Sequence, residues 1–327
     1  MRILVAGGAG YIGSNMTLML KRAGHEPVLY DNLSKGHRAA ARDAEFIEGD
    51  LSDYPLLCKT LKDERIEAVM HFAAFTEVDE SVREPLQYYT NNFCNTSLLL
   101  RAMEHTGIEK LVFSSSAAVY GMPETVPIVE DLPKMPINPY GHTKWAVERM
   151  CHFQSEAGKL RYAALRYFNA AGAGDNGTLG EDHRPESHLV PLTIQAAMGK
   201  REDIKIFGTD YTTEDGTCVR DYIHVEDLCK AHILALEKLG DRRQLFYNLG
   251  NGTGYSVRQV IETVGKVSGK EIKVTEADRR PGDAAILTAD ASKAISQLGW
   301  KTDYPQLEKI VESAWAWHNA KPNGYGD

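Results

Sequence analysis

Short apolar runs alternate with longer segments of helical periodicity through the first half of the chain. Apolar runs of about four to eight residues rich in β-branched side chains predict strands, and apolar positions three or four apart predict helices. The pattern predicts strands at residues 2–6, 26–30, 45–48, 67–72, 110–114 and 162–166. It predicts helices at residues 12–23, 54–63, 86–105 and 140–157. Strands that are apolar on both faces and alternate with helices indicate an α/β fold with a doubly wound parallel sheet.

The alternation weakens after about Phe168, where residues 169–187, rich in glycine and acidic side chains, predict a loop. The rest of the chain predicts short strands and helices at residues 190–198, 225–236, 257–267 and 306–319. We therefore expect two domains: a larger one at residues 1–168 and a smaller, irregular α/β domain at residues 169–327. Some segments of the second can return to the first sheet.

Composition and charge narrow the class of partner. The 327 residues are 43% hydrophobic and 25% charged, which is ordinary globular usage. An excess of 45 acidic over 37 basic side chains gives a net charge of −8, the wrong sign for non-specific binding to nucleic acid or to an anionic membrane. We expect neither partner, and an anionic ligand would need a locally basic pocket.

The cysteines and the amino terminus indicate the compartment. Five scattered cysteines without a CxxC pair suit a reducing cytosol and disfavour a disulfide framework or a structural zinc site. The amino terminus starts directly with an apolar strand-like run and lacks the layout of a signal peptide. No stretch approaches about twenty apolar residues, so we expect a cytoplasmic protein without a membrane span.

Three glycines, Gly7, Gly10 and Gly13, lie between the first predicted strand and the first predicted helix. A glycine-rich turn lets backbone N–H groups approach a pyrophosphate, and the helix N-terminus adds about half a positive charge. An acidic protein can therefore bind a dinucleotide here without a basic side chain. The alternative is a turn that caps the helix and binds nothing.

Acidic residues follow the second and third predicted strands. Asp31 can accept hydrogen bonds from ribose hydroxyls and repel a 2′-phosphate, which favours NAD over NADP. A plain turn aspartate is the alternative, and the nearby Lys35 and Arg38 weaken the preference for NAD. Asp50 can accept from the adenine amino group or cap the helix that follows.

Tyr140 and Lys144 are spaced i, i+4, so a helix would place both on one face. An ammonium group near a phenol favours the phenolate, lowers the tyrosine pKa and makes a base. An isolated YxxxK is more often a surface helix with a solvated lysine. Ser116, at the end of the preceding strand, can hold a substrate hydroxyl against the phenol, whereas Ser114 and Ser115 can merely bond backbone groups.

Longer motifs carry a family resemblance. The segments GGAGYIG, HFAA and SSSAAVYG, with Tyr140-x-x-x-Lys144, resemble the extended short-chain dehydrogenase/reductase superfamily. RYFNAAG, HLVP, IFGTDYTTEDGTCVRDYIHVEDL and RRPGD resemble the UDP-galactose (UDP-glucose) 4-epimerases of that superfamily in order and spacing. The match covers essentially the whole chain. It implies a Rossmann-type NAD-binding domain at residues 1–168, a UDP-sugar-binding domain at residues 169–327, a homodimer and a place in galactose metabolism.

The resemblance also implies site residues. The catalytic residues would be Ser116, Tyr140 and Lys144. The NAD-binding residues would be Gly7, Gly10, Tyr11, Ile12, Gly13, Asp31, Asn32, Asp50, Leu51, Phe72, Ala73, Ala74, Asn91, Ser114, Tyr140, Lys144 and Tyr167. The UDP-hexose-binding residues would be Ser116, Tyr140, Asn169, His188, Leu189, Phe207, Arg220, Arg280, Asp283 and Leu287.

Within this set the resemblance implies particular contacts. Asn169 would contact a substrate phosphate, Leu189 and Phe207 would flank the uracil, and Asp283 would hold the uridine ribose. Arg220 and Arg280 would bind the diphosphate, although each alone is more often a surface ion pair.

The mechanism that the resemblance implies is C4 oxidation followed by return of the same hydride. Tyr140 would take the 4-hydroxyl proton while hydride passes from C4 to the nicotinamide. The 4-keto sugar would then rotate and receive the hydride on its opposite face.

Other activities remain as alternatives. Dehydratases of the superfamily carry an acidic pair where this chain has Ala117-Ala118-Val119, so elimination is disfavoured. Decarboxylases and 4-epimerases acting on UDP-xylose or UDP-glucuronate share the NAD and Tyr-Lys apparatus and stay open. A non-catalytic NAD-binding regulator is disfavoured because the tyrosine and the lysine are retained.

Three further positions bear on specificity and on metal binding. Thr76 replaces a lysine of some relatives and receives no charge role. Leu287 falls where the superfamily tunes the pocket for the hexose C2 substituent, and its intermediate size predicts poor use of UDP-GalNAc. His183 and His188, with their acidic neighbours, match no standard ligand spacing, so we expect a solvated loop and no metal.

Overall fold

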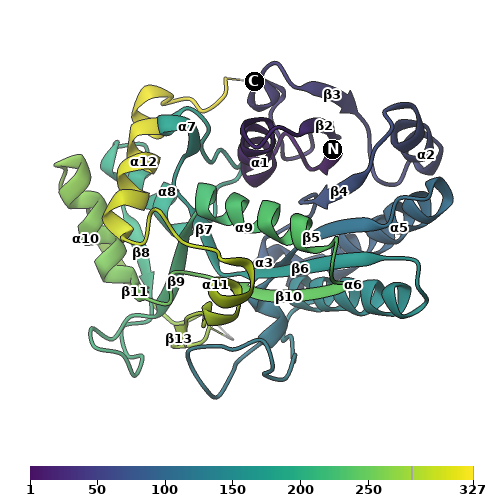
Figure 1. Cartoon of the computed structure of the whole chain (residues 1–327). Helices are drawn as coiled ribbons and strands as arrows, with labels where there is room; N and C mark the ends of the chain where they lie inside the picture. Colours follow the sequence, from purple (N-terminus) through teal and green to yellow (C-terminus); the bar gives the residue numbers. More distant parts are fainter. Residues whose placement is uncertain (281–282, 327) are drawn as a thin grey trace.

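Seven parallel strands form the central sheet in the order β10-β6-β5-β4-β1-β2-β3 (Figure 1). The computed structural model describes residues 1–280 and 283–326. The sheet strands are β1 Arg2–Ala6, β2 Glu26–Asp31, β3 Glu45–Glu48, β4 Ala68–His71, β5 Lys110–Ser116, β6 Arg161–Tyr167 and β10 Gln244–Leu249. The predicted parallel sheet is confirmed, and the strand order is that of the doubly wound Rossmann-type fold.

Helices cover both faces of this sheet because successive strand residues alternate between two apolar clusters. Ile3 and Val5 of β1 belong to the cluster that includes helices α1, α9 and α11. Leu4 and Ala6 belong to the cluster that includes helices α2, α5 and α6. The six helices are α1 Tyr11–Arg22, α2 Tyr54–Asp63, α5 Asn95–Thr106, α6 Pro139–Glu156, α9 Val225–Lys238 and α11 Ser292–Leu298.

The helix predicted at residues 86–105 is interrupted. The structure has α3 Val78–Arg83 and α4 Pro85–Tyr88, then a π-helical segment at Tyr89–Cys94, and only then α5. The buried Asn92 lies in the π-helical segment, and its side chain exchanges hydrogen bonds with the backbone N–H and C=O of Phe75, at 2.8 and 2.9 Å. The apolar pattern cannot report this change of helical pitch, because it registers only which side chains are buried.

The second half forms smaller layers at one end of the sheet (Figure 1). Strand β9 Val219–His224 pairs with β7 Asn169–Ala171, β11 Gly254–Ser256 and β13 Ile286–Leu287. A second pair consists of β8 Ile204–Phe207 and β12 Val274–Ala277. The helices here are α7 Gly174–Gly177, α8 Leu189–Ala197, α10 Val257–Ser268 and α12 Leu307–Ala320.

The loop predicted at residues 169–187 is therefore only partly a loop. Its first residues form β7, whose Asn169, Ala170 and Ala171 pair in register with residues 222–224 of β9. The sequence missed this strand because its partner lies about fifty residues further along the chain, and a three-residue strand leaves no periodicity. None of the helices in the described residues is long and apolar enough to cross a membrane.

Candidate functional site

A cleft of about 960 Å³ lies where the carboxyl ends of β1, β4 and β5 face residues of the second half. Its walls contain every residue that the sequence assigned to NAD and most of those assigned to UDP-hexose. Leu189 and Phe207 are the two that do not line it. Leu189 packs instead into apolar clusters with residues of α8 and α10. The described lining also includes residues that the sequence analysis did not assign, notably Phe75, Thr76, Asn138, Glu181 and His183.

The glycine turn at the start of α1 permits close backbone approach. Gly7 has φ +81°, and a Cβ there would lie 2.5 Å from the backbone nitrogen of Ala73. A Cβ on Gly13 would lie 2.0 Å from the carbonyl oxygen of Gly7. Gly10 is the N-cap of α1, and a Cβ there would make only an ordinary van der Waals contact, at 3.4 Å from the carbonyl oxygen of Gly7. The helix N-terminus is thus held at the cleft with no side chain in front of it.

Asp31 lies buried at the end of β2, next to this turn. Its carboxylate accepts hydrogen bonds from the backbone N–H of Ala9, at 2.9 Å, and of Leu33, at 2.8 Å. Burial raises the pKa of Asp31, and these two bonds oppose the rise. Asp31 therefore stabilises the turn through its side chain, which was the alternative to ribose binding. It also places a carboxylate in the wall of the cleft.

The two basic residues that weakened the NAD preference have other partners. Lys35 lies 3.3 Å from Glu77, and the Arg38 guanidinium stacks on Phe46 at 4.2 Å from the ring centre. Asp50 does not cap the next helix, because Asp53 is the residue that accepts from the backbone N–H of Leu56. Asp50 instead accepts from the side chain of Asn32 at 2.5 Å.

Close packing of α6 against the end of β5 brings Tyr140 and Ser116 together. The side chain of Asn138 caps α6 by accepting from the backbone N–H of Gly141 at 2.8 Å. A Cβ on Gly141 would lie 2.5 Å from the carbonyl oxygen of Ala118, so only glycine allows this approach. The first turn of α6 therefore packs against the segment that follows Ser116.

Lys144 reaches from α6 to the end of β5. Its Nζ donates to the carbonyl oxygen of Ser114 at 2.8 Å and lies 5.9 Å from the ring centre of Tyr140. The hydroxyl of Ser114 is hydrogen-bonded to Tyr167, and the hydroxyl of Ser115 donates to Glu148 at 2.5 Å. These two serines thus bond side chains rather than backbone groups, and of the three only Ser116 and Ser114 line the cleft.

The electrostatics of this pair differ from the expectation. Burial lowers the pKa of Lys144 to about 7. Burial also raises the pKa of Tyr140, and a hydrogen bond with Ser116 only partly opposes that rise. The expected lowering of the tyrosine pKa by an ammonium was wrong for this structure, because desolvation disfavours both charged forms and dominates at this depth.

A buried ion pair lies beneath these residues. Glu148 of α6 accepts from Arg166 Nε at 2.9 Å and Nη2 at 2.6 Å, and the exposed fractions of the two side chains are 1% and 3%. Arg166 also donates to the hydroxyl of Tyr120 at 2.8 Å, and that hydroxyl donates to Asn248 of β10 at 2.7 Å. The network joins α6, β6 and β10.

The second half contributes two arginines to the site. Arg220 on β9 donates to Asp283 at 2.9 Å and to the carbonyl oxygens of Val219 and Ala284, each at 2.8 Å. The guanidinium of Arg280 lies 4.0 Å from the ring centre of Phe207. Phe207 therefore supports a residue of the cleft wall although it does not line the cleft itself. Two residues of the RRPGD motif, Pro281 and Gly282, lie outside the described residues.

The remaining assigned residues lie at the junction of the two halves. Asn169 donates to the backbone carbonyl of Asp221 at 2.9 Å, which fixes β7 beside β9. Leu287 on β13 lines the cleft and packs with Val119 and Tyr120.

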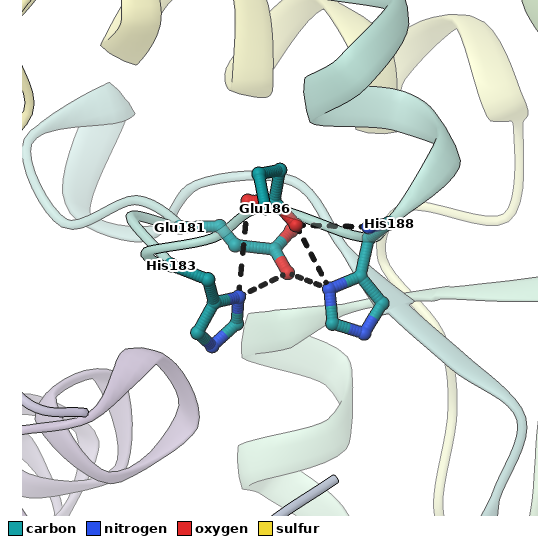
Figure 2. Close-up of side chains that lie close together, drawn as sticks. All are labelled: Glu181, His183, Glu186 and His188. Atoms are coloured by element: carbon teal, nitrogen blue, oxygen red, sulfur yellow. Dashed lines mark hydrogen bonds and ion pairs between the residues drawn. The ribbon is translucent and has the colours of Figure 1, made fainter. Parts of the chain in front are cut away.

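The segment from Glu181 to His188 is not the solvated loop that we expected. The side chains of Glu181 and Glu186 are each 5% exposed, and both meet His183 and His188 (Figure 2). Their alternation of acid and histidine, E-x-H-x-x-E-x-H, was the available signal. The pattern predicts no site from the sequence because the segment is loop-like and matches no standard ligand spacing.

Comparison with known proteins identifies the relatives of this fold and site. The family model described as "NAD dependent epimerase/dehydratase family" matches residues 3–250. The chain belongs to this family. It is 52% identical to a UDP-glucose 4-epimerase of Halalkalibacterium halodurans over 99% of this chain and 98% of that protein.

Solved structures agree with the sequence comparison. A UDP-glucose 4-epimerase from Brucella ovis in complex with NAD superposes with a TM-score of 0.94 at 46% identity, covering 96% of this chain and 97% of that one. The enzyme from Bifidobacterium longum in complex with NAD+ and UDP has a TM-score of 0.94 at 36% identity, covering 99% of this chain and 100% of that one.

The buried Lys144 predicts a pH-dependent stability. Its pKa of about 7 lies below the ordinary 10.5, so the unfolded chain binds this proton more tightly and the free energy of unfolding rises with pH between those values. Lys144→Met should flatten this rise. At pH 7 this substitution should raise the free energy of unfolding by about 1–2 kcal/mol, because relief of the lysine's desolvation outweighs the lost hydrogen bond.

Urea unfolding at pH 7 and pH 9, at one fixed NAD concentration, measures the effect. Lys59→Met is the control, because that side chain is 74% exposed. An unchanged pH dependence in Lys144→Met would show that the lysine is not held in a desolvated site.

Proposed function

We propose that the chain catalyses the NAD-dependent interconversion of UDP-glucose and UDP-galactose by oxidation and re-reduction at C4 of the sugar. The observation that carries the proposal is that one cleft brings together the glycine turn, the group Ser116, Tyr140 and Lys144, and the two arginines of the second half. The full-length similarity to UDP-glucose 4-epimerases supports the sugar, and the complexes of relatives with NAD and UDP support the cofactor and the nucleotide.

The cofactor side of the cleft suits NAD. Gly7 and Gly13 have no Cβ, and one at either position would clash with nearby backbone. The turn can therefore hold the N-terminus of α1 so that its backbone N–H groups face a pyrophosphate. Asp31 places a carboxylate where ribose hydroxyls can be bound, and it would repel a 2′-phosphate. We assign to NAD the residues expected from the sequence, all of which line the cleft.

The chemistry follows from three side chains. When bound, NAD supplies an acceptor for the hydride that leaves C4 and returns it later. Tyr140, in its phenolate form, would take the proton of the 4-hydroxyl and hold it on the phenol oxygen until the hydride returns. Ser116, which bonds Tyr140, positions the sugar hydroxyl. Burial disfavours the phenolate by raising the pKa of Tyr140, and Lys144, whose Nζ lies 5.9 Å from the ring centre, would offset that cost in its protonated form.

The nucleotide side of the cleft holds UDP firmly and leaves the hexose free to turn. Arg220 is oriented by Asp283 and by two backbone carbonyls, so its guanidinium is fixed before an anion arrives. Arg280, stacked on Phe207, supplies a second positive charge for the diphosphate. Inversion at C4 requires the 4-keto sugar to present its other face, and tight diphosphate contacts with loose sugar contacts permit that rotation.

Rival activities differ in what they need from the same cleft. The residues after Ser116 are Ala117, Ala118 and Val119, which carry no acid or base for elimination. UDP-xylose and UDP-glucuronate remain the alternative sugars. A protein that only binds NAD would have no need of the fixed arrangement of Ser116, Tyr140 and Lys144.

Removal of the Tyr140 hydroxyl gives the first test of this reaction. The purified chain should convert UDP-galactose to UDP-glucose without added NAD, because the hydride is returned in each cycle. Tyr140→Phe should lower kcat by about 10²–10⁴-fold, which is the usual contribution of a general base, and should retain bound NAD. Tyr54→Phe on α2, outside the cleft lining, should keep full activity. Near-normal turnover by Tyr140→Phe would remove the tyrosine from the mechanism.

Leu287 predicts the sugar range. We expect kcat/KM for UDP-GalNAc at least about 10-fold below that for UDP-galactose, because one misfitting group in a packed pocket costs about 1–3 kcal/mol. Leu287→Ala should raise kcat/KM for UDP-GalNAc relative to that for UDP-galactose. Parallel assays with UDP-GalNAc, UDP-xylose and UDP-glucuronate measure the range. Equal use of UDP-galactose and UDP-GalNAc by the unaltered chain contradicts the prediction.

Exposed apolar side chains on adjoining helices support a homodimer. Leu86 is 79% exposed, and Val82 and Phe153 are each 62% exposed, on α4, α3 and α6 respectively. Both α3 and α4 contact α6, so the three exposed side chains lie on helices that pack against one another. Apolar surface of this kind on a globular chain is typical of an interface.

We expect light scattering to give twice the chain mass of 36.3 kDa. The double change Leu86→Glu/Phe153→Glu should give the monomer mass, because it buries two charges in the interface. Ile295→Glu introduces a charge at an exposed apolar residue elsewhere, on α11, and should leave the dimer intact. A monomer mass for the unaltered chain would refute the dimer.

A further inference from the structure

Two glutamates and two histidines converge in the loop between α7 and α8 (Figure 2). Glu181, His183, Glu186 and His188 each offer one potential ligand atom, and the four atoms lie within 4.8 Å of one another. All four residues also line the wall of the cleft or support it, yet none is needed to take a proton from the sugar.

The spacings between these atoms suit a single ion. His188 Nδ1 lies 2.8 Å from Glu181 Oε1 and 3.1 Å from Glu186 Oε1. His183 Nδ1 lies 3.1 Å from Glu181 Oε1 and 3.8 Å from Glu186 Oε2. Ligand atoms around a tetrahedral Zn²⁺ with bonds of about 2.0–2.2 Å lie about 3.4 Å apart. The observed spacings bracket that value, so small movements of the side chains would accommodate the ion.

The Nδ1 atom of His183 is poorly aligned with the carboxylates around it. It is buried and makes no aligned hydrogen bond, although a carboxylate oxygen lies 3.1 Å away. This nitrogen meets the carboxylates of Glu181 and Glu186 as ion-pair partners but forms no well-aligned hydrogen bond with either, and a buried polar atom paired so poorly calls for an explanation. A nitrogen directed at an ion shared with its neighbours explains both the short distance to the oxygen and the poor alignment with it.

The charge and burial of the two glutamates also favour a bound cation. The carboxylates of Glu181 and Glu186 are each 5% exposed and face each other across the two imidazoles. Two buried carboxylates need two positive charges nearby. A divalent cation supplies them with both histidines neutral, and neutral imidazole is the form that binds metals.

We propose that Glu181, His183, Glu186 and His188 bind one Zn²⁺. Two nitrogens and two carboxylate oxygens suit a borderline cation such as Zn²⁺ better than Mg²⁺ or Ca²⁺, which prefer oxygen ligands alone. Four protein ligands fill a tetrahedral shell and leave no position for substrate, so the site is structural rather than catalytic. The inference does not depend on the proposed reaction.

The ion would fasten one wall of the cleft. Its ligands span eight residues, and His188 is also the N-cap residue from which α8 begins. The ring of His183 meets the ring of Tyr11 edge-on at 6.5 Å, and the Tyr11 hydroxyl donates to Gly172 at 2.6 Å. Closing the loop on a metal would therefore fix the start of α8 next to the glycine turn.

Metal binding by the untagged full-length chain tests the site directly. After treatment with a chelator and removal of the chelator, the chain should bind one equivalent of Zn²⁺ with a Kd on the order of 1 μM or tighter. Zn²⁺ at a hundredfold excess over Kd should raise Tm by about 4 °C. Co²⁺ should give the intense visible absorption of a four-coordinate site.

Two isosteric changes locate the ion. His183→Gln and Glu186→Gln should each weaken Zn²⁺ binding by about 100-fold, since each removes a ligand from a closed shell. His105→Gln, an exposed histidine at the end of α5, is the matched control and should bind Zn²⁺ as the unaltered chain does.

Three results would overturn the proposal. These are no uptake of Zn²⁺ at 10 times the expected Kd, uptake that the two variants retain, and no change in Tm on Zn²⁺ addition. Each would leave the four residues as two imidazolium–carboxylate ion pairs. The measurements on the unaltered chain decide the question even if a variant fails to fold.

Discussion

The buried ion pair between Arg166 and Glu148 is the interaction on which the site depends. Two charges removed from water are tolerable only because the guanidinium and the carboxylate meet in a two-point contact and their remaining hydrogen-bonding positions are filled by Ser115 and Tyr120. Such a pair adds little to net stability but penalises every arrangement that separates the partners. It therefore fixes α6 against β5 and β6 in a single register.

That register is what the chemistry requires. Tyr140 and Lys144 come from α6, and Ser116 comes from the end of β5, so their mutual positions change whenever the helix slides along the strand. The same fixed packing explains why the charged form of Lys144 is disfavoured. Because α6 cannot move away, Lys144 remains buried with a pKa near 7, and the folded chain tolerates a charge that is expensive to keep there.

Local signals predicted what depends on local structure. The apolar alternation gave the parallel sheet, and the Gly7, Gly10 and Gly13 spacing gave the turn at its carboxyl end, because both are set by residues close in sequence. The tyrosine pKa, the inward packing of Leu189 and the break at Tyr89–Cys94 were missed. Each depends on which distant groups surround a side chain. The convergence of Glu181 and His188 was missed for the same reason, since irregular backbone gives no periodicity to read.

The return of β10 to the first sheet has a consequence for the order of folding. Strand β10 pairs with β6 along its whole length, yet residues 168–243 separate them in the chain. During synthesis β6 can pair with β5 on one side, but its other side stays an exposed sheet edge until most of the second half has been made. The nascent first half must be protected from aggregation through that edge over this interval. The sheet of the first half is thus complete only after β10, which lies in the second half, has been synthesised.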